Sequence, residues 1–171
     1  MSLNNSIIPA SNPSLSPSQK TEQYESLLLF SVGKLNLALR VESAQKILRY
    51  SEIHGSGMTS VGLLHIDEQE ITVIDLHKKL FQISQQLNSR QKPFIILAKN
   101  SFNESFAIIV GETPTLREIP RSKIRILPDS YRRADTLNIA SHVTIIEEEN
   151  QSSTVFILDV DSLVSPHNSN Q

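Results

Sequence analysis

The chain contains no cysteine and no tryptophan, and only five of its 171 residues are glycine. Without cysteine it can form neither disulfide bonds nor thiolate metal sites, and this composition fits a cytoplasmic location. Long apolar runs are also missing. The longest are Leu27–Phe30 and Phe94–Ala98, far short of the ~20 residues that a membrane-spanning helix needs. We therefore expect no direct insertion into a membrane.

The chain also lacks the motifs by which many enzymes are recognised. It has no Gly-x-Ser-x-Gly nucleophile turn, no glycine-rich phosphate loop and no ligands at metal-binding spacing. Its net charge of -2 gives no electrostatic footprint for nucleic acid or for an anionic membrane. The sequence therefore predicts a non-enzymatic protein that needs no cofactor and acts through its surfaces and partners.

Length and composition predict one folded domain between two tails. Hydrophobic residues make up 39% of the chain, which is enough for a core, and 171 residues suit a single domain. Residues 1–23 are rich in Ser, Asn and Pro and lack the pattern of a signal peptide. We expect residues 1–23 and 166–171 to be disordered, because such segments bury too little apolar surface to offset the cost of ordering. The folded domain is expected over residues 24–165.

Between these tails, the sequence predicts many short strands. Leu35–Val41 alternates apolar and polar residues at the two-residue period of a half-buried strand, and Gly33 is expected to turn the chain after Leu27–Val32. Residues 42–50 fit a short helix or a short strand. Arg121–Lys123 fits one helical turn, and Asp159 and Asp161 fit a cap or an Asx-turn. Further strands are predicted at Phe94–Ala98, Phe106–Val110, Thr115–Ile119, Ile124–Leu127, Leu137–Ile146 and Val155–Val160.

The most informative segment is Gly62–Leu76, together with the residues that follow it. Gly62–Ile66 and Ile71–Leu76 are predicted as two strands of a hairpin around the acidic turn Asp67–Glu70. Lys78–Phe81 then has the pattern of a brief helical turn.

This hairpin resembles the signature of the CheW-like family, whose members are adaptors that couple chemoreceptors to the histidine kinase CheA. The hairpin carries the family's Ile-Asp-Leu at the end of its second strand and the basic Leu/Phe segment after it. Other matching segments follow in the family's order and cover roughly residues 25–164: Leu27–Val32, Gly33, Leu37–Leu39, Phe106–Val110, Arg117–Ile119, Ile124–Pro128 and Val155–Val160.

The resemblance implies an all-β fold of two small five-stranded SH3-like barrels packed together, with a few short helices. It also implies an adaptor in chemotaxis or motility signalling, in which one barrel binds a CheA-type histidine kinase. The groove between the barrels is then expected to bind the cytoplasmic tip of a chemoreceptor, a methyl-accepting protein. The partner-binding residues that the resemblance implies are Ala44, Lys46, Leu48, Tyr50, His65, Asp67, Glu68 and Thr72.

The chain departs from the family pattern inside this set. Asp67-Glu68 stands where the family has an Arg-Gly turn, Thr72 replaces a proline, and Lys46 stands where relatives often have an acidic residue. Lys46 and Asp67 thus look like the family's charge pair with its signs exchanged, and we hypothesise that they meet and select the partner. Glu68 in place of glycine means that the turn either needs no positive φ or tolerates one with strain.

Three other functions stay open. A scaffold for type IV pilus, surface or light-directed motility would use the same fold with a different partner. His65 and His77, with the carboxylates near them, could hold zinc or iron in an enzyme if they converged, although solvent-facing histidines are the simpler interpretation. A basic cluster could bind RNA or single-stranded DNA, but only Tyr131 lies there to stack on bases, so an acidic protein partner fits better. That cluster consists of Arg117, Arg121, Lys123, Arg125, Arg132 and Arg133.

Overall fold

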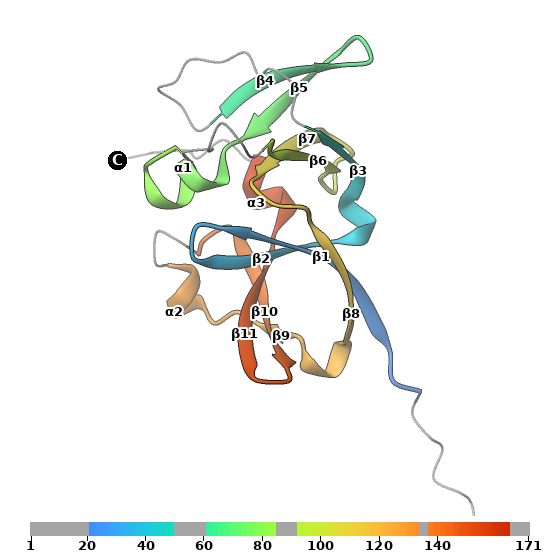
Figure 1. Cartoon of the computed structure of the whole chain (residues 1–171), viewed down its shortest axis with the longest axis vertical. Coiled ribbons are helices and arrows are strands. Elements are labelled where there is room, and N and C mark those ends of the chain that lie inside the picture. The colour runs from blue at the N-terminus through green and yellow to red at the C-terminus, as the bar shows by residue number, and fades with distance from the viewer. Residues whose placement is uncertain (1–20, 50–60, 85–91, 134–136, 165–171) are drawn as a thin grey trace, which may run out of the picture.

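The computed structural model describes residues 21–49, 61–84, 92–133 and 137–164, which form two β-sheets and a few short helices (Figure 1). Sheet A has the strand order β8-β1-β2-β11-β10-β9, and sheet B has the order β3-β6-β7-β5-β4. The strands of sheet A are β1 (Tyr24–Val32), β2 (Leu35–Arg40), β8 (Thr115–Pro120), β9 (Arg125–Ile126), β10 (Ala140–Glu148) and β11 (Gln151–Leu158). Those of sheet B are β3 (Ala44–Arg49), β4 (Val61–Ile66), β5 (Gln69–Ile74), β6 (Phe94–Lys99) and β7 (Ser105–Val110).

Sheet B is inserted in the chain between two parts of sheet A. After β1 and β2 the chain passes through the 3₁₀ turn η1 (Val41–Ser43) into sheet B, and it returns through residues 111–114 to β8. Each sheet contains two hairpins joined by one parallel pairing, which is β2 with β11 in sheet A and β5 with β7 in sheet B. The two sheets therefore repeat one topology, and the chain crosses between them twice.

The expected all-β fold of two β units with few short helices is confirmed. Sheet B has the predicted five strands, whereas sheet A has a sixth, because the short segment β9 pairs with β10. The strand expected over Ile124–Leu127 is limited to Arg125–Ile126, since Pro128 follows at once and begins helix α2 (Asp129–Arg132). Each sheet curls around its own apolar interior, where end strands and central strands share one cluster.

Two local ambiguities are resolved by packing. Residues 44–49 form strand β3, since Ile47 pairs with Ile96 on one face while Leu48 packs into the interior of sheet B on the other. The single turn expected at Arg121–Lys123 is the 3₁₀ turn η2. The sequence reading missed helix α3 (Val160–Val164) but placed a cap in front of it. Asp159 accepts hydrogen bonds there from the backbone N–H of Asp161 and Ser162 at 3.2 and 3.4 Å.

One apolar layer between the sheets is the largest core of the molecule. In the described residues it contains sixteen buried side chains, whereas the clusters inside sheet A and inside sheet B contain five each. The strict alternation of β1 explains this division. Leu28, Phe30 and Val32 face sheet B, whereas the alternate residues Leu27 and Leu29 face the interior of sheet A. Both faces of the central strands are therefore buried.

The first hairpin turn is fitted closely against helix α1 (Leu76–Phe81). Gly33 has φ +58°, and a Cβ added there would lie 2.8 Å from Cε2 of Phe81. The helix is fixed by Asp75, whose side chain accepts a hydrogen bond from the backbone N–H of Lys78 at 2.9 Å. His77 stacks on Phe81 with ring centroids 5.0 Å apart. Glycine is required at this turn for both its φ angle and its lack of a side chain.

Gly33→Ala should therefore lower the free energy of unfolding by about 2 kcal/mol or more. A left-handed residue with a Cβ costs roughly 1–2 kcal/mol, and overpacking against the Phe81 ring adds roughly 1–3 kcal/mol. Urea denaturation measures the change. The same substitution in a Phe81→Leu background should cost less, because the ring contact is gone. Equal losses in the two backgrounds would contradict the contact, and no loss in either would contradict the φ argument.

Candidate interaction surfaces

The residues expected on the first edge of sheet B divide into packed and exposed positions. Ala44 is half-buried against the core between the sheets, and Leu48 is half-buried against the interior of sheet B. Lys46 is exposed. Tyr50 lies outside the described residues. Of the three residues that the structure describes here, Lys46 alone offers a mainly exposed side chain to a partner, and Ala44 and Leu48 contribute chiefly to packing.

The residues expected on the hairpin lie at its tip and on its outer face. His65 is exposed on β4, and Asp67 and Glu68 are the exposed two-residue turn between β4 and β5. Thr72 is half-buried on β5, opposite Leu63. The turn is shorter than the four residues expected, since Gln69 already pairs with Ile66. These four positions stand on one projecting element, with the acidic turn at its end (Figure 1).

The acidic turn has positive φ angles at both of its residues, +48° at Asp67 and +66° at Glu68. Two consecutive positive φ angles are typical of the type I′ turn, which fits the twist of a hairpin. Asp tolerates this region because its short side chain can bond locally, whereas Glu has no such compensation. Of the two possibilities left open by the sequence, the chain therefore adopts the strained one at Glu68.

The charge pair hypothesised between Lys46 and Asp67 is not formed in this structure. The ion pairs found among the described residues join Arg40 and Arg121 to Glu25, and Arg117 to Glu148. Lys46 and Asp67 are both exposed and belong to different edges of sheet B. Their charges are therefore available to an external partner, and they do not neutralise each other.

Both edge strands of sheet B expose large aliphatic side chains. Ile47 on β3 is 43% exposed, and Leu63 on β4 is 47% exposed. β3 and β4 stand at the two ends of the sheet order, so each is paired with one strand in the part of the chain that the structure describes. An exposed edge strand with apolar side chains is a common docking element, because it offers both backbone hydrogen bonds and apolar area.

A groove of about 480 Å³ lies where sheet B meets helix α3. Among the members of the expected set that the structure describes, Thr72 is the one that lines it. The β6–β7 loop forms another wall and is tied to α3 by Asp161, whose carboxylate accepts hydrogen bonds from the backbone N–H and from Oγ of Ser101, both at 2.8 Å. Within the loop, Asn100 accepts hydrogen bonds from the N–H groups of Phe102 and Glu104. The loop is thereby held in one shape at the junction of the two sheets.

Phe102 was missed by the sequence reading. Its side chain is 76% exposed and lines the groove, on a loop that is otherwise polar. The strands on either side of this loop were predicted at Phe94–Ala98 and Phe106–Val110, but the aromatic residue in the polar segment between them was itself a signal of an interaction site.

The basic cluster of residues 117–133 does not form one free positive surface. Arg117 is paired with Glu148 at 3.1 Å, and Arg121 lies 3.7 Å from a carboxylate oxygen of Glu25. Lys123 and Arg125 line a separate depression of about 370 Å³ whose walls include Val143, Ile145 and Glu147. Apolar area beside two cations suits an acidic, partly apolar protein surface better than a nucleic-acid backbone.

The two histidines considered as metal ligands do not converge. His77 donates a hydrogen bond from Nδ1 to the carbonyl oxygen of Ile83 at 2.6 Å and stacks on Phe81, whereas His65 is exposed on β4. In the parts of the chain that can be described, no group of three His, Cys, Asp or Glu residues is placed to hold a metal ion. No helix there is long and apolar enough to cross a membrane.

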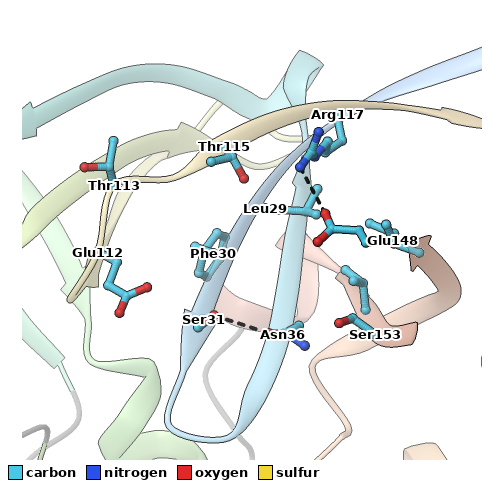
Figure 2. Close-up of a pocket in the computed structure, with 12 residues that line it drawn as sticks. Leu29, Phe30, Ser31, Asn36, Glu112, Thr113, Thr115, Arg117, Glu148 and Ser153 are labelled. Atoms are coloured by element: carbon cyan, nitrogen blue, oxygen red, sulfur yellow. Dashed lines mark hydrogen bonds and ion pairs between the residues drawn. The ribbon is translucent and has the colours of Figure 1, made fainter. Parts of the chain in front are cut away.

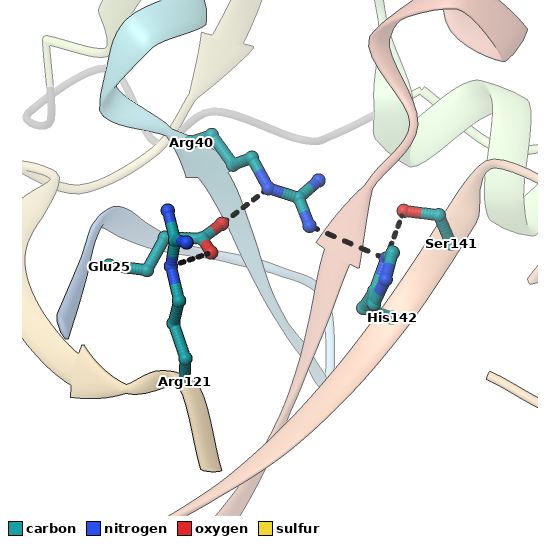
Figure 3. Close-up of polar contacts among 5 residues, drawn as sticks. All are labelled: Glu25, Arg40, Arg121, Ser141 and His142. Carbon is teal, nitrogen blue, oxygen red and sulfur yellow. Dashed lines mark hydrogen bonds and ion pairs between the residues drawn. The ribbon is translucent and has the colours of Figure 1, made fainter. Parts of the chain in front are cut away.

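A polar cluster in sheet A joins the start of β1, the end of β2, the turn η2 and the start of β10 (Figure 3). The Glu25 carboxylate, with its side chain only 12% exposed, accepts from Nε of Arg40 and lies near Arg121. Nδ1 of His142 lies 3.4 Å from the Arg40 guanidinium and 2.8 Å from Oγ of Ser141. An Arg donor at Nδ1 requires the neutral ring with its proton on Nε2. Burial, and then the Arg40 charge, lower the pKa of His142 below its usual value near 6.5.

These features are typical of a protein-binding module. Two small β-sheets back to back, with apolar edges, an open groove and a charged projecting turn, suit a module that binds other proteins. The CheW-like domain model matches residues 26–167, and the chain therefore belongs to the CheW-like domain family, as its sequence predicts.

A solved structure agrees with this assignment. The chain is similar to the scaffolding protein TtCheW from Thermoanaerobacter tengcongensis, with a TM-score of 0.70 over 91% of this chain and 97% of that chain. The two sequences are 13% identical, so this likeness establishes the fold alone. No curated protein matches the chain significantly.

Replacing Glu68 by glycine should raise the free energy of unfolding by up to about 1 kcal/mol. Glycine removes a left-handed strain of roughly 1–2 kcal/mol, and part of that gain is offset by the greater freedom of glycine in the unfolded chain. Urea denaturation measures the difference. Glu68→Gln is the matched control, since it removes the charge and keeps the strain. A gain of equal size in Glu68→Gln would assign the effect to charge and contradict the strain at this turn.

The His142 cluster predicts a pH-dependent stability. Because the folded pKa lies below the unfolded one, the unfolded chain binds more protons just below pH 6.5, and the free energy of unfolding falls as pH drops through that range. The groups that face the ring include Arg40 and Arg132, which lower the pKa, and Glu25 and Asp159, which raise it. Urea midpoints at several pH values should fall less steeply in His142→Gln. Identical pH profiles in the two proteins would contradict this prediction.

Proposed function

We propose that this protein is a non-enzymatic cytoplasmic adaptor that joins a chemoreceptor to a CheA-type histidine kinase. The observation that supports this proposal most strongly is membership of the CheW-like domain family over residues 26–167. The fold, shared with a protein described as a scaffold, adds independent support. An adaptor of this kind catalyses no step. Its effect follows from mass action, because each contact changes how often the kinase and the receptor occupy one complex.

The kinase is proposed to bind the edges of sheet B. Ile47 and Leu63 offer apolar area on strands β3 and β4, each of which pairs with a single strand among the described residues. The acidic turn Asp67-Glu68 lies at the end of the hairpin that contains β4. Apolar contacts supply the binding energy, and the surrounding charges set the choice of partner and the rate of association. The partner surface expected here is apolar at its centre and basic where it meets the turn.

The receptor is proposed to bind at the junction of the two sheets. The groove between sheet B and α3 contains Thr72 and has the exposed ring of Phe102 at its side. A helical hairpin presents side chains at regular spacing, and an aromatic ring beside an open groove can pack between two such side chains. The rigid attachment of the β6–β7 loop through Asp161 reduces the entropy lost when that ring is bound.

The reversed charges favour a specific partner rather than any family partner. Lys46 and Asp67 both carry the sign opposite to that expected at their positions, and both are exposed without a mutual contact. A partner that met the usual signs would meet like charges here, which disfavours binding. A scaffold that serves pilus-driven or light-directed movement through its own kinase is therefore the second candidate, and it uses the same two surfaces.

The test is binding of the purified chain to a CheA-type histidine kinase and to a chemoreceptor fragment from the same organism. Asp67→Lys should raise the dissociation constant for the kinase by about tenfold or more, equal to about 1.4 kcal/mol, because the basic partner surface then meets a like charge. Calorimetry or analytical gel filtration measures the change.

Glu149→Lys is the control for this experiment. It makes the same charge reversal at the exposed β10–β11 turn on sheet A, and it should leave the dissociation constant within about twofold. Absence of kinase binding by the unmodified chain would refute the adaptor function. Equal effects of the two reversals would refute the location on sheet B while keeping the function.

A further inference from the structure

A cavity distinct from the groove at helix α3 and from the depression beside Lys123 opens on sheet A (Figure 2). Its volume is about 210 Å³, and it lies between the β1–β2 hairpin, the start of β8 and the β10–β11 hairpin. Leu29, Ile146 and Val155 form apolar walls that continue into the interior cluster of sheet A. The size is below the roughly 300–1,000 Å³ of pockets that hold a whole cofactor or drug-sized ligand. It suits a single side chain.

The mouth of this cavity carries an excess of negative charge. Glu112 and Glu148 reach toward the cavity from opposite sides, and Arg117 is the one cation among the described residues that line it (Figure 2). Arg117 donates to Oε1 of Glu148 at 3.1 Å, whereas no ion pair of Glu112 is found among the residues that the structure describes. Two carboxylates against one guanidinium leave one negative charge uncompensated, and that charge lies at Glu112.

Neutral acceptors surround the same opening. Ser31 donates its hydroxyl hydrogen to Oδ1 of Asn36 at 3.2 Å, so the lone pairs of its own oxygen remain able to accept. Thr113 and Thr115 add two more hydroxyl groups on the side of β8. The cavity thus has apolar walls below a mouth that carries one carboxylate and several hydroxyl oxygens. This arrangement matches a group that has a long aliphatic stem and three hydrogen-bond donors at its end.

We propose that this cavity binds a lysine side chain of a partner protein. The four methylenes of lysine would pack along Leu29, Ile146 and Val155, and its ammonium group would meet Glu112 at the mouth. Lysine fits better than arginine, because its ammonium is compact and its three donors rotate. The planar guanidinium prefers to bind one carboxylate through two parallel hydrogen bonds, whereas the mouth offers Glu112 together with the hydroxyl groups of Ser31 and Thr113, which suit a rotating ammonium group.

This inference rests on the proposed function only in requiring that the chain binds other proteins. The cavity belongs to sheet A, whereas the surfaces proposed for the kinase and the receptor belong to sheet B and to its junction with α3. The lysine contact therefore adds a third point of attachment. Its loss should leave kinase binding through sheet B in place.

The test uses N-acetyl-lysine methylamide as the probe and amide chemical shifts of the full chain as the readout. Saturable shifts are expected in β1, residues 112–115 and the β10–β11 hairpin, with a dissociation constant on the order of 1 mM, as a single side chain allows. The norleucine analogue, which keeps the stem and lacks the ammonium, should bind at least about fivefold more weakly. Higher salt should weaken lysine binding, since the ion pair at the mouth is open to solvent.

Glu112→Gln should raise the dissociation constant of the lysine probe by about fivefold or more, and Glu149→Gln should leave it unchanged. Glu149 is the matched control, because it is an exposed glutamate on the β10–β11 turn that does not line the cavity. Equal binding of the lysine and norleucine probes, or equal binding by the two variants, would overturn the proposal. Kinase binding measured on the same Glu112→Gln protein separates the two outcomes. If kinase binding persists while the lysine probe never binds, the cavity proposal alone is wrong.

Discussion

The apolar layer between sheet A and sheet B is the constraint on which the rest of the molecule depends. Each sheet encloses an interior cluster of only five buried side chains in the described residues, whereas the layer between the sheets holds sixteen. A buried aliphatic side chain contributes about 1.5–3 kcal/mol, so most of the hydrophobic stabilisation lies in contacts that neither sheet could make alone. Helix α1 and helix α3 contribute Leu80 and Leu163 to this layer, which places both helices at the junction.

This arrangement decides where partners can bind. The central strands bury one face against the other sheet and the other face inside their own curl, so they have no surface left to offer. The accessible features are the edges of the sheets, the turns, the cavity at the end of curled sheet A and the groove where sheet B meets helix α3. The exposed aliphatics Ile47 and Leu63 lie on edges, Phe102 lies on a turn at the junction, and the lysine cavity opens at the end of the curl of sheet A. A protein built in this way presents several small separate contacts.

The sequence alone predicted most of the strands, because their signals are periodic and local, whereas the arrangement in two barrels came from the family resemblance. The alternation in Leu35–Val41 and the β-branched run in Ile71–Ile74 identify strands, and Gly33 marks a turn that needs a positive φ. The helical turn after the hairpin was predicted within two residues of its actual start. Pairing between distant strands carries no such local signal. The parallel contacts of β2 with β11 and of β5 with β7 were therefore not predicted, and the sixth strand β9 is too short to show a period.

The surfaces were harder to predict, for a related reason. Ala44 and Leu48 were expected to bind a partner from the family resemblance, but their side chains are half-buried because strand β3 packs on both faces. Lys46 and Asp67 were expected to meet, and they do not, because spacing in sequence does not fix which edges of a curled sheet lie together. Glu112 and Glu148 lie 36 positions apart and show no motif, yet they line one cavity. Contacts between side chains from different hairpins depend on the full topology.

The shared core also limits how the protein can transmit a signal. Allosteric coupling needs two states of the protein that its ligands bind with different affinity. Here the segment that forms sheet B is inserted between two parts of sheet A, so the chain passes between the sheets twice. The sheets also share one close-packed apolar layer, and a relative shift of the sheets would therefore disrupt many contacts at once. A rigid body with several binding surfaces acts by holding its partners at a fixed spacing, which raises their effective concentration for each other. In the proposed adaptor, information about a receptor state would then pass through the geometry of the assembled complex, and a change in the shape of this chain would not be required.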